Sequence, residues 1–201
     1  MSGNKENLEA SSFSTPNRMV WQYFETLRRL VRSPREPDDS IRRQNIALCI
    51  FMGVTVVETF MNVFFRVAVS EEGRRRHEKG FLADLDHRRS LDYKIRNWPS
   101  KILGQEIDLT SGIGRDFSTL KGKRNSLMHF TSTHDTLNIG GLVINGTANT
   151  AAFDDLVPDD AVFALKTAEG IIALILSMNG ATDKQLPWAV QLWTGKVPLE
   201  S

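Results

Sequence analysis

The sequence predicts an all-α protein, a bundle of four to six helices with a short β-hairpin-like insertion before the last long helix. Three observations support this fold class. Apolar residues recur at helical spacing between residues 18 and 31. The run over 46–69 is apolar on nearly every side, which is typical of a central buried helix. A second long apolar helix is expected over about 160–180, where Gly180 closes it.

The N-terminal part is expected to hold two helices that are separated by a loop. The first runs from about Arg18 to Val31, because its apolar side chains form one stripe. The segment "SPREPDD" then reads as a loop, since it contains two prolines. Ser40 is a suitable cap for the second helix, which extends to about Val69.

The rest of the chain predicts further helices and one hairpin. Pro99 is expected to kink or end a helix in the segment that follows the charged run "EEGRRRHEKG". Another helix is expected over about 112–131. The segment near 137–147 combines β-branched residues with a Gly-Gly pair, which predicts a short hairpin.

The chain divides into three parts by composition. Residues 1–17 read as a disordered polar leader, and they lack the apolar core of a secretory signal. Residues 18–185 form the predicted helical domain. Residues 186–201 are a C-terminal tail that carries Trp188 and Trp193 and can pack back on the bundle.

Charge and cysteine content limit the classes of function. The net charge of +1 offers no global attraction for nucleic acid, so any basic surface must be local. Cys49 is the only cysteine, and its apolar surroundings predict a buried thiol in a reducing compartment. A cytoplasmic location is therefore expected.

The apolar run over 46–69 is interpreted as a buried helix rather than a membrane span. Glu58, Asn62 and Arg66 interrupt it at intervals of four residues, so they share one helical face. We expect no membrane association. His77, His87 and His134 lack the cysteine or acid spacing of a zinc site, so neither a metal nor a cofactor is predicted.

The stretch "KRNSLMHF" places polar groups inside an apolar helix. Arg124 follows Leu120 by four residues and so falls on the apolar stripe. An unpaired arginine there would cost several kcal/mol, so it requires an acid or an anion. Glu58 is the obvious acid on the central helix. We therefore predict that Glu58 and Arg124 meet across two packed helices, with Asn62 and Asn125 close by.

A structural interpretation of the same residues stays open. A buried Arg–Glu pair can fix the register of two helices without taking part in chemistry. His129 can donate a simple hydrogen bond near the end of its helix. Lys121 and Lys123 can track a phosphate backbone or belong to a solvated face.

The segment "RNSLMH" resembles the R-N-x-x-x-H signature of the HEPN superfamily (higher eukaryotes and prokaryotes nucleotide-binding domains). That motif has an arginine, a polar residue, and a histidine after four to six intervening positions. Arg124, Asn125 and His129 match it with four. "VETFMNVFF" resembles the central-helix pattern, and the segment from "LDYK" to the motif, with Lys94, resembles the approach to it. The resemblance covers roughly residues 40–180.

The resemblance implies a helical domain that pairs into a homodimer and brings two motifs to a shared cleft. Many members are metal-independent ribonucleases of toxin–antitoxin or defence systems. By this likeness His129 acts as general base or acid, and Arg124 holds the scissile phosphate. Asn125 orients one of them, and Glu58 positions Arg124. Lys121, Lys123 and Asn62 are then expected to contact RNA.

The expected function is that of a metal-independent endoribonuclease that cleaves RNA by attack of the 2′-hydroxyl. Its expected partners are an RNA substrate, a second copy of the chain and an antitoxin protein. Two alternatives stay open. One is a non-catalytic HEPN-like module that binds RNA, nucleotide or protein, and the other is a structural interaction bundle.

Overall fold

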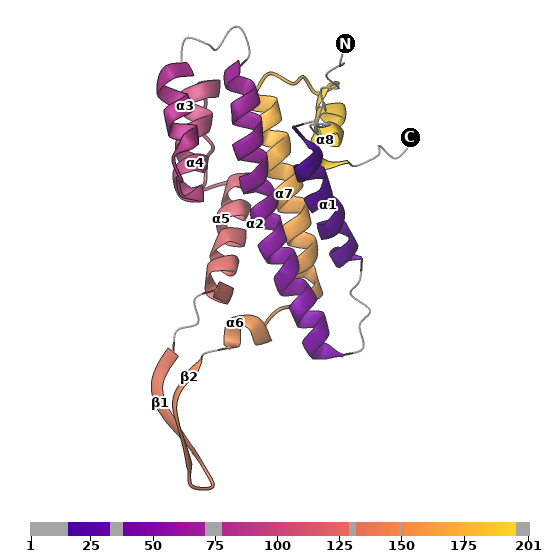
Figure 1. The fold of residues 1–201 in the computed structure, drawn as a ribbon. Coiled ribbons are helices and arrows are strands. Elements are labelled where there is room, and N and C mark those ends of the chain that lie inside the picture. Colours follow the sequence, from indigo (N-terminus) through magenta and orange to yellow (C-terminus); the bar gives the residue numbers. More distant parts are fainter. Residues whose placement is uncertain (1–15, 33–37, 71–77, 129–131, 149, 196–201) are drawn as a thin grey trace, which may run out of the picture.

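The computed structural model describes residues 16–32, 38–70, 78–128, 132–148 and 150–195. The described residues form eight α-helices, one π-helical turn and one two-stranded sheet (Figure 1). The all-α class and the hairpin insertion are therefore confirmed. The helices outnumber the four to six expected because short helices also form between the long ones. The leader, apart from residues 16 and 17, lies outside the described residues.

Two long helices form the centre of the bundle. They are α2 (Asp39–Ser70) and α7 (Pro158–Met178), which lie side by side in Figure 1. Their backbones approach closely at Gly53, where an added Cβ would lie 3.1 Å from the Ala164 carbonyl oxygen. Helix α1 (Arg18–Val31) packs on both. This helix has the bounds that the sequence predicted.

The start of α2 differs from the prediction at its cap. Asp38, not Ser40, caps the helix, since its Oδ1 accepts hydrogen bonds from the amides of Ser40 at 2.7 Å and Ile41 at 3.2 Å. A carboxylate also interacts more favourably than a hydroxyl with the positive end of the helix dipole.

The other side of the central pair carries α3 (Glu78–Asp86), α4 (Leu91–Trp98) and α5 (Gly112–Met128). Helix α4 ends at Trp98, directly before Pro99, as expected, and the chain continues as a π-helical turn over Pro99–Leu103. Phe65 of α2, Phe81 of α3 and Trp98 of α4 form one aromatic cluster that joins these three helices.

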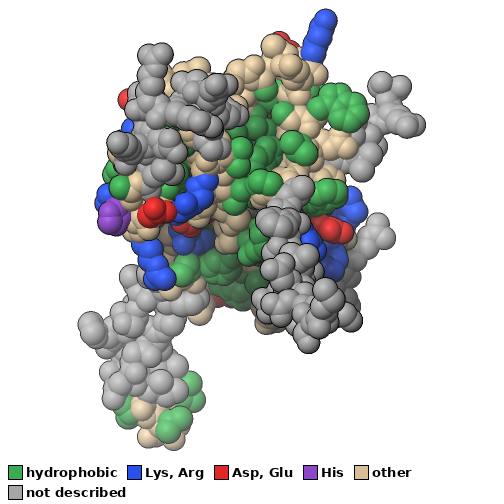
Figure 2. Space-filling view, turned by 45° about the horizontal axis from the view of Figure 1, so that its top comes forward, with side chains coloured by type: hydrophobic (Ala, Val, Ile, Leu, Met, Phe, Trp, Pro, Cys, Tyr) green, Lys and Arg blue, Asp and Glu red, His purple; other side chains and the backbone are tan. Residues whose placement is uncertain are grey.

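The predicted hairpin is present and stands apart from the helices. Its strands are β1 (Ser132–Ile139) and β2 (Leu142–Ala148), antiparallel and joined by Gly140 and Gly141, which both have positive φ. Figures 1 and 2 show the hairpin projecting beyond the bundle, with exposed hydrophobic side chains at its tip (Ile139, Leu142 and Val143). A short helix, α6 (Ala151–Asp154), leads from it to α7.

The described part of the tail forms a helix, α8 (Leu186–Thr194), that packs on α1 and α7. Trp193 is buried, with its ring 4.9 Å from Phe60 and 6.0 Å from Phe64 between centroids. Trp188, by contrast, is 67% exposed. The two tryptophans of the tail therefore have different surroundings: Trp193 is part of the core, and Trp188 is not.

Helices α2 and α7 are both long and apolar enough to cross a membrane by length and composition. About half of each apolar stretch is buried inside the bundle. Core helices of bundles share these properties, and here both helices lie at the centre of the packing.

A buried carboxylate ties α3 to α4. The side chain of Asp84 is 7% exposed, and it accepts hydrogen bonds from Arg89 Nε at 2.7 Å, Lys101 Nζ at 3.2 Å and Trp98 Nε1 at 3.3 Å. Burial alone would raise the pKa of Asp84, but hydrogen bonds from Arg89, Lys101 and Tyr93 outweigh it and hold the pKa below its ordinary value.

We expect Asp84→Asn to lower the free energy of unfolding by about 2 kcal/mol at neutral pH, because it weakens several charge-assisted hydrogen bonds at once. The depressed pKa means that this contribution is present above the unfolded-state pKa of about 3.9 and is lost as pH falls through the lower folded-state value. Urea unfolding at neutral and acid pH measures both effects. Asp86→Asn is the matched control, since Asp86 is 69% exposed and pairs only at the surface with Arg66. Equal losses in the two variants would contradict the assignment.

Candidate functional site

The motif stretch lies at the C-terminal end of α5. Phe117, Leu120 and Leu127 are buried against the bundle and fix the orientation of this helix. Arg124 is half-buried beside that stripe, and Asn125 is exposed. His129, the predicted general acid or base, lies outside the described residues.

The predicted ion pair between Glu58 and Arg124 is wrong. Glu58 of α2 pairs instead with Lys94 of α4, with 2.5 Å between Oε1 and Nζ. Glu58 pairs with Lys94 because Lys94 is the more deeply buried of the two cations. The Lys94 side chain is only 8% exposed, whereas Arg124 is half-buried and so reaches solvent more easily. The more deeply buried cation has the greater need of the carboxylate.

The burial of Lys94 could also have been predicted from the spacing of apolar residues in the sequence. Lys94 shares the buried stripe of α4 with Leu91, Ile95 and Trp98, at helical spacings. The reasoning that singled out Arg124 as a cation on an apolar stripe applies equally to Lys94. Its ammonium also lies 5.6 Å from the centre of the Trp98 ring, a favourable cation–π contact.

Arg124 is left without an acidic partner in the described part of the chain. None of the described carboxylates lies within 4.0 Å of its guanidinium, and its Nε is buried without a hydrogen-bond partner there. Among the described residues, the one hydrogen-bond partner of its Nη1 is the thioether of Met128, at 3.6 Å, and sulfur is a weak acceptor. A guanidinium in this state has unused donors that suit an anion.

The two lysines that precede Arg124 are both engaged with carboxylates. Lys121 pairs with Asp92 of α4, and Lys123 Nζ lies 2.7 Å from Asp160 Oδ1 at the start of α7. Burial lowers the pKa of Lys121, and the nearby positive charge of Arg124 lowers it further. Lys121 and Lys123 therefore connect α5 to its neighbours as well as adding positive charge.

The two asparagines lie on different helices of this region. Asn62 is half-buried on α2, one turn after Glu58, and Asn125 is exposed on α5. No hydrogen bond between described residues joins either of them to Arg124. Two ion pairs, Glu58–Lys94 and Lys121–Asp92, thus connect α2, α4 and α5, and Arg124 lies near Lys121 on α5 with no carboxylate partner among the described residues.

Other chemistry-bearing groups lie elsewhere. Cys49 is buried as predicted, and burial raises the pKa of its thiol to about 11. The described residues include no group of three or more His, Cys, Asp or Glu side chains arranged to hold a metal ion.

Comparison of the chain with protein-family models, with curated proteins and with solved structures finds no match.

Proposed function

We propose that the chain is a HEPN-like, metal-independent endoribonuclease that acts as a homodimer. The observation that carries the proposal is Arg124, whose half-buried guanidinium has no carboxylate partner among the described residues. It lies on α5 next to Asn125 and precedes His129 in the sequence with the R-N-x-x-x-H spacing. An arginine in that setting is suited to a phosphate, whose two oxygens match the guanidinium fork.

The proposed chemistry assigns one task to each motif residue. Arg124 binds the scissile phosphate and stabilises the charge that develops on its oxygens. His129 exchanges a proton with the 2′-hydroxyl or the leaving oxygen, since histidine has a reference pKa of about 6.5. Asn125 orients one of these groups. Lys121, Lys123 and Asn62 contribute to RNA contact.

The role proposed for Glu58 changes with its partner. Glu58 holds Lys94 rather than Arg124, so it supports the site by fixing α4 against α2. Lys121 links the same α4 to α5 through Asp92. These two ion pairs join α2 to α4 and α4 to α5, so they act indirectly by holding the helix that carries Arg124.

Assembly supplies the second proton-transfer group in this proposal. Cleavage by 2′-hydroxyl attack requires one proton to leave the nucleophile and another to reach the leaving oxygen. Two copies of the chain, facing each other through their motifs, provide two histidines. A defence or toxin–antitoxin setting, with an antitoxin protein that restrains the enzyme, belongs to the same proposal.

The test is an RNA cleavage assay in the presence of EDTA. The native chain is expected to cleave RNA and to leave 2′,3′-cyclic phosphate ends, because the attacking group is the adjacent hydroxyl. His129→Ala, purified in the same way, is expected to lose about 10²–10⁴-fold of this activity. Cleavage that is equal in the two preparations, or that requires an added metal ion, contradicts the proposal.

A non-catalytic RNA- or nucleotide-binding module is the second candidate. The pairing of Lys121 with Asp92 and of Lys123 with Asp160 favours a single nucleotide over a long RNA as the ligand of such a module, because these lysines are less available to a phosphate backbone and Arg124 alone can hold one phosphate. The second candidate predicts binding that is lost in Arg124→Ala and no cleavage by the native chain.

A further inference from the structure

A second surface with ligand-binding character lies on α1 and α8. Figure 1 shows these helices on the opposite side of the α2–α7 pair from α5. We define the aromatic–arginine surface by six residues: Trp21, Arg28, Arg29, Arg32, Trp188 and Leu192. It is separate from the motif region, so its role is independent of the proposed cleavage.

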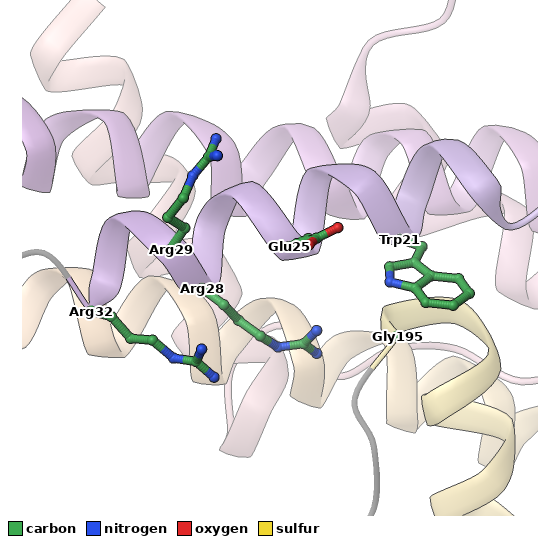
Figure 3. Close-up of a pocket in the computed structure, with 6 residues that line it drawn as sticks. All are labelled: Trp21, Glu25, Arg28, Arg29, Arg32 and Gly195. Atoms are coloured by element: carbon green, nitrogen blue, oxygen red, sulfur yellow. The ribbon is translucent and has the colours of Figure 1, made fainter.

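The surface consists of two adjoining hollows. The larger, about 650 Å³, is lined by the three arginines with Trp21, Glu25 and Gly195 (Figure 3). The smaller, about 270 Å³, is mostly apolar and is lined by Trp21, Trp188, Gln191, Leu192 and Gly195. Trp21 and Gly195 line both, so the two hollows adjoin and give the surface a basic part and an apolar part.

The apolar part is exposed and yet built on fixed elements. Trp21, Trp188 and Leu192 are 47%, 67% and 61% exposed, so three large apolar side chains lie open to solvent in one small region. Trp21 packs on Gly195, where an added Cβ would lie 2.0 Å from the indole Nε1. Only glycine, with φ of 67° here, permits that close contact at the end of α8.

The basic part keeps an excess of positive charge. Arg28 is held by Glu169 at 2.9 Å and by the carbonyl oxygen of Thr194 at 2.5 Å. Arg29 and Arg32 are exposed, and none of the described carboxylates lies within 4.0 Å of either. Figure 3 shows Arg28 and Arg32 extending to the same side of α1, whereas Arg29 points away from them.

We propose that the aromatic–arginine surface binds an acidic peptide segment of a partner protein, with a large apolar side chain as its anchor. The anchor fits between Trp21, Trp188 and Leu192, since aromatic residues dominate such binding sites. Carboxylates that flank the anchor reach the exposed guanidinium of Arg32, which can bind them bidentately.

Charge and lining chemistry favour this occupant over two others. Single-stranded RNA would also meet arginines and aromatic rings, but the apolar hollow includes an aliphatic Leu192 and has few polar groups for base edges. A second copy of the chain would bring the same exposed arginines against each other if it docked through the same surface. An acidic, apolar segment complements both parts at once.

To test this, peptides are selected from a displayed library of random 12-residue sequences, with the full chain as bait. The affinity of each selected peptide for the chain is then measured by fluorescence anisotropy. Selected peptides are expected to combine Asp or Glu with Trp, Phe or Leu. Trp188→Ala and Arg32→Glu are each expected to weaken their binding by about tenfold or more. Arg96→Glu, which reverses an exposed charge on α4, is the matched control and should change affinity less than about twofold.

Three outcomes would overturn the proposal. The first is that selection yields no peptide whose binding depends on Trp188 and Arg32. The second is that the selected peptides lack acidic residues. The third is that a single-stranded RNA of similar length binds the surface more tightly and loses affinity in the same two variants. The variant Arg124→Ala should bind the peptides normally, so this test and that of the cleavage proposal can fail separately.

Discussion

Arg124→Ala is expected to reduce RNA cleavage by about 10²–10³-fold while it changes the free energy of unfolding by less than about 1 kcal/mol. The loss of activity follows from the proposed phosphate contact, because the neighbouring Lys121 and Lys123 are already paired with Asp92 and Asp160. The small effect on stability follows from the surroundings of Arg124. Its guanidinium has no carboxylate partner among the described residues, and it lies near the like charge of Lys121.

Two further variants sharpen this experiment. Arg124→Lys keeps the charge and loses the planar fork, so it should retain only part of the activity. Arg115→Ala is the matched control on the same helix, because Arg115 is 67% exposed and its nearest acid among the described residues is Asp116, at 3.9 Å. Cleavage and urea unfolding are measured for all three variants. Full activity in Arg124→Ala, or a loss explained entirely by unfolding, would contradict the role assigned to Arg124.

Glu58→Ala is expected to lower the free energy of unfolding by about 3 kcal/mol, the largest stability effect that the site predicts. It leaves the ammonium of Lys94, which is 8% exposed, without its carboxylate. Loss of one member of a buried pair typically costs about 3–5 kcal/mol, and the 37% exposure of Glu58 places the expected cost at the lower end.

A double variant identifies the partner of Glu58. Lys94→Met removes the buried charge and keeps the volume of the side chain, so Glu58→Ala combined with Lys94→Met should recover most of the lost stability. Urea unfolding of the single and double variants gives the coupling energy. If Arg124→Ala, and not Lys94→Met, recovered the stability lost in Glu58→Ala, the partner of Glu58 would be Arg124. That result would contradict the observed Glu58–Lys94 pair.

The fold was largely predictable because local rules determine most of it. The bounds of α1 follow from one apolar stripe, and the hairpin follows from the Gly140–Gly141 pair between β-branched residues. The cap of α2 was placed on Ser40 and belongs to Asp38, two residues earlier. That difference is small because either residue type can cap a helix, and the pattern alone does not rank two candidates that lie two residues apart.

The candidate site was only partly predictable because its ion pairs depend on tertiary packing. Periodicity identified Glu58 and Arg124 as charged groups on apolar helices, but Glu58 is 37% exposed and Arg124 is half-buried, so neither lies as deep as the pattern predicted. It did not reveal which cation lies deeper, and Lys94 takes the carboxylate for that reason. The partners of Lys121 and Lys123, on α4 and α7, are likewise set by how three helices meet.

The most direct test of the central claim is the affinity of a 2′-O-methyl RNA, which cannot be cleaved by 2′-hydroxyl attack, for the native chain and two variants over a series of salt concentrations. His129→Ala should bind it within about twofold of the native chain, because histidine acts on protons rather than on binding. Arg124→Ala should bind it about tenfold or more weakly, with a shallower dependence on salt. Equal affinity and equal salt dependence for Arg124→Ala and the native chain would contradict the claim that this guanidinium binds a phosphate.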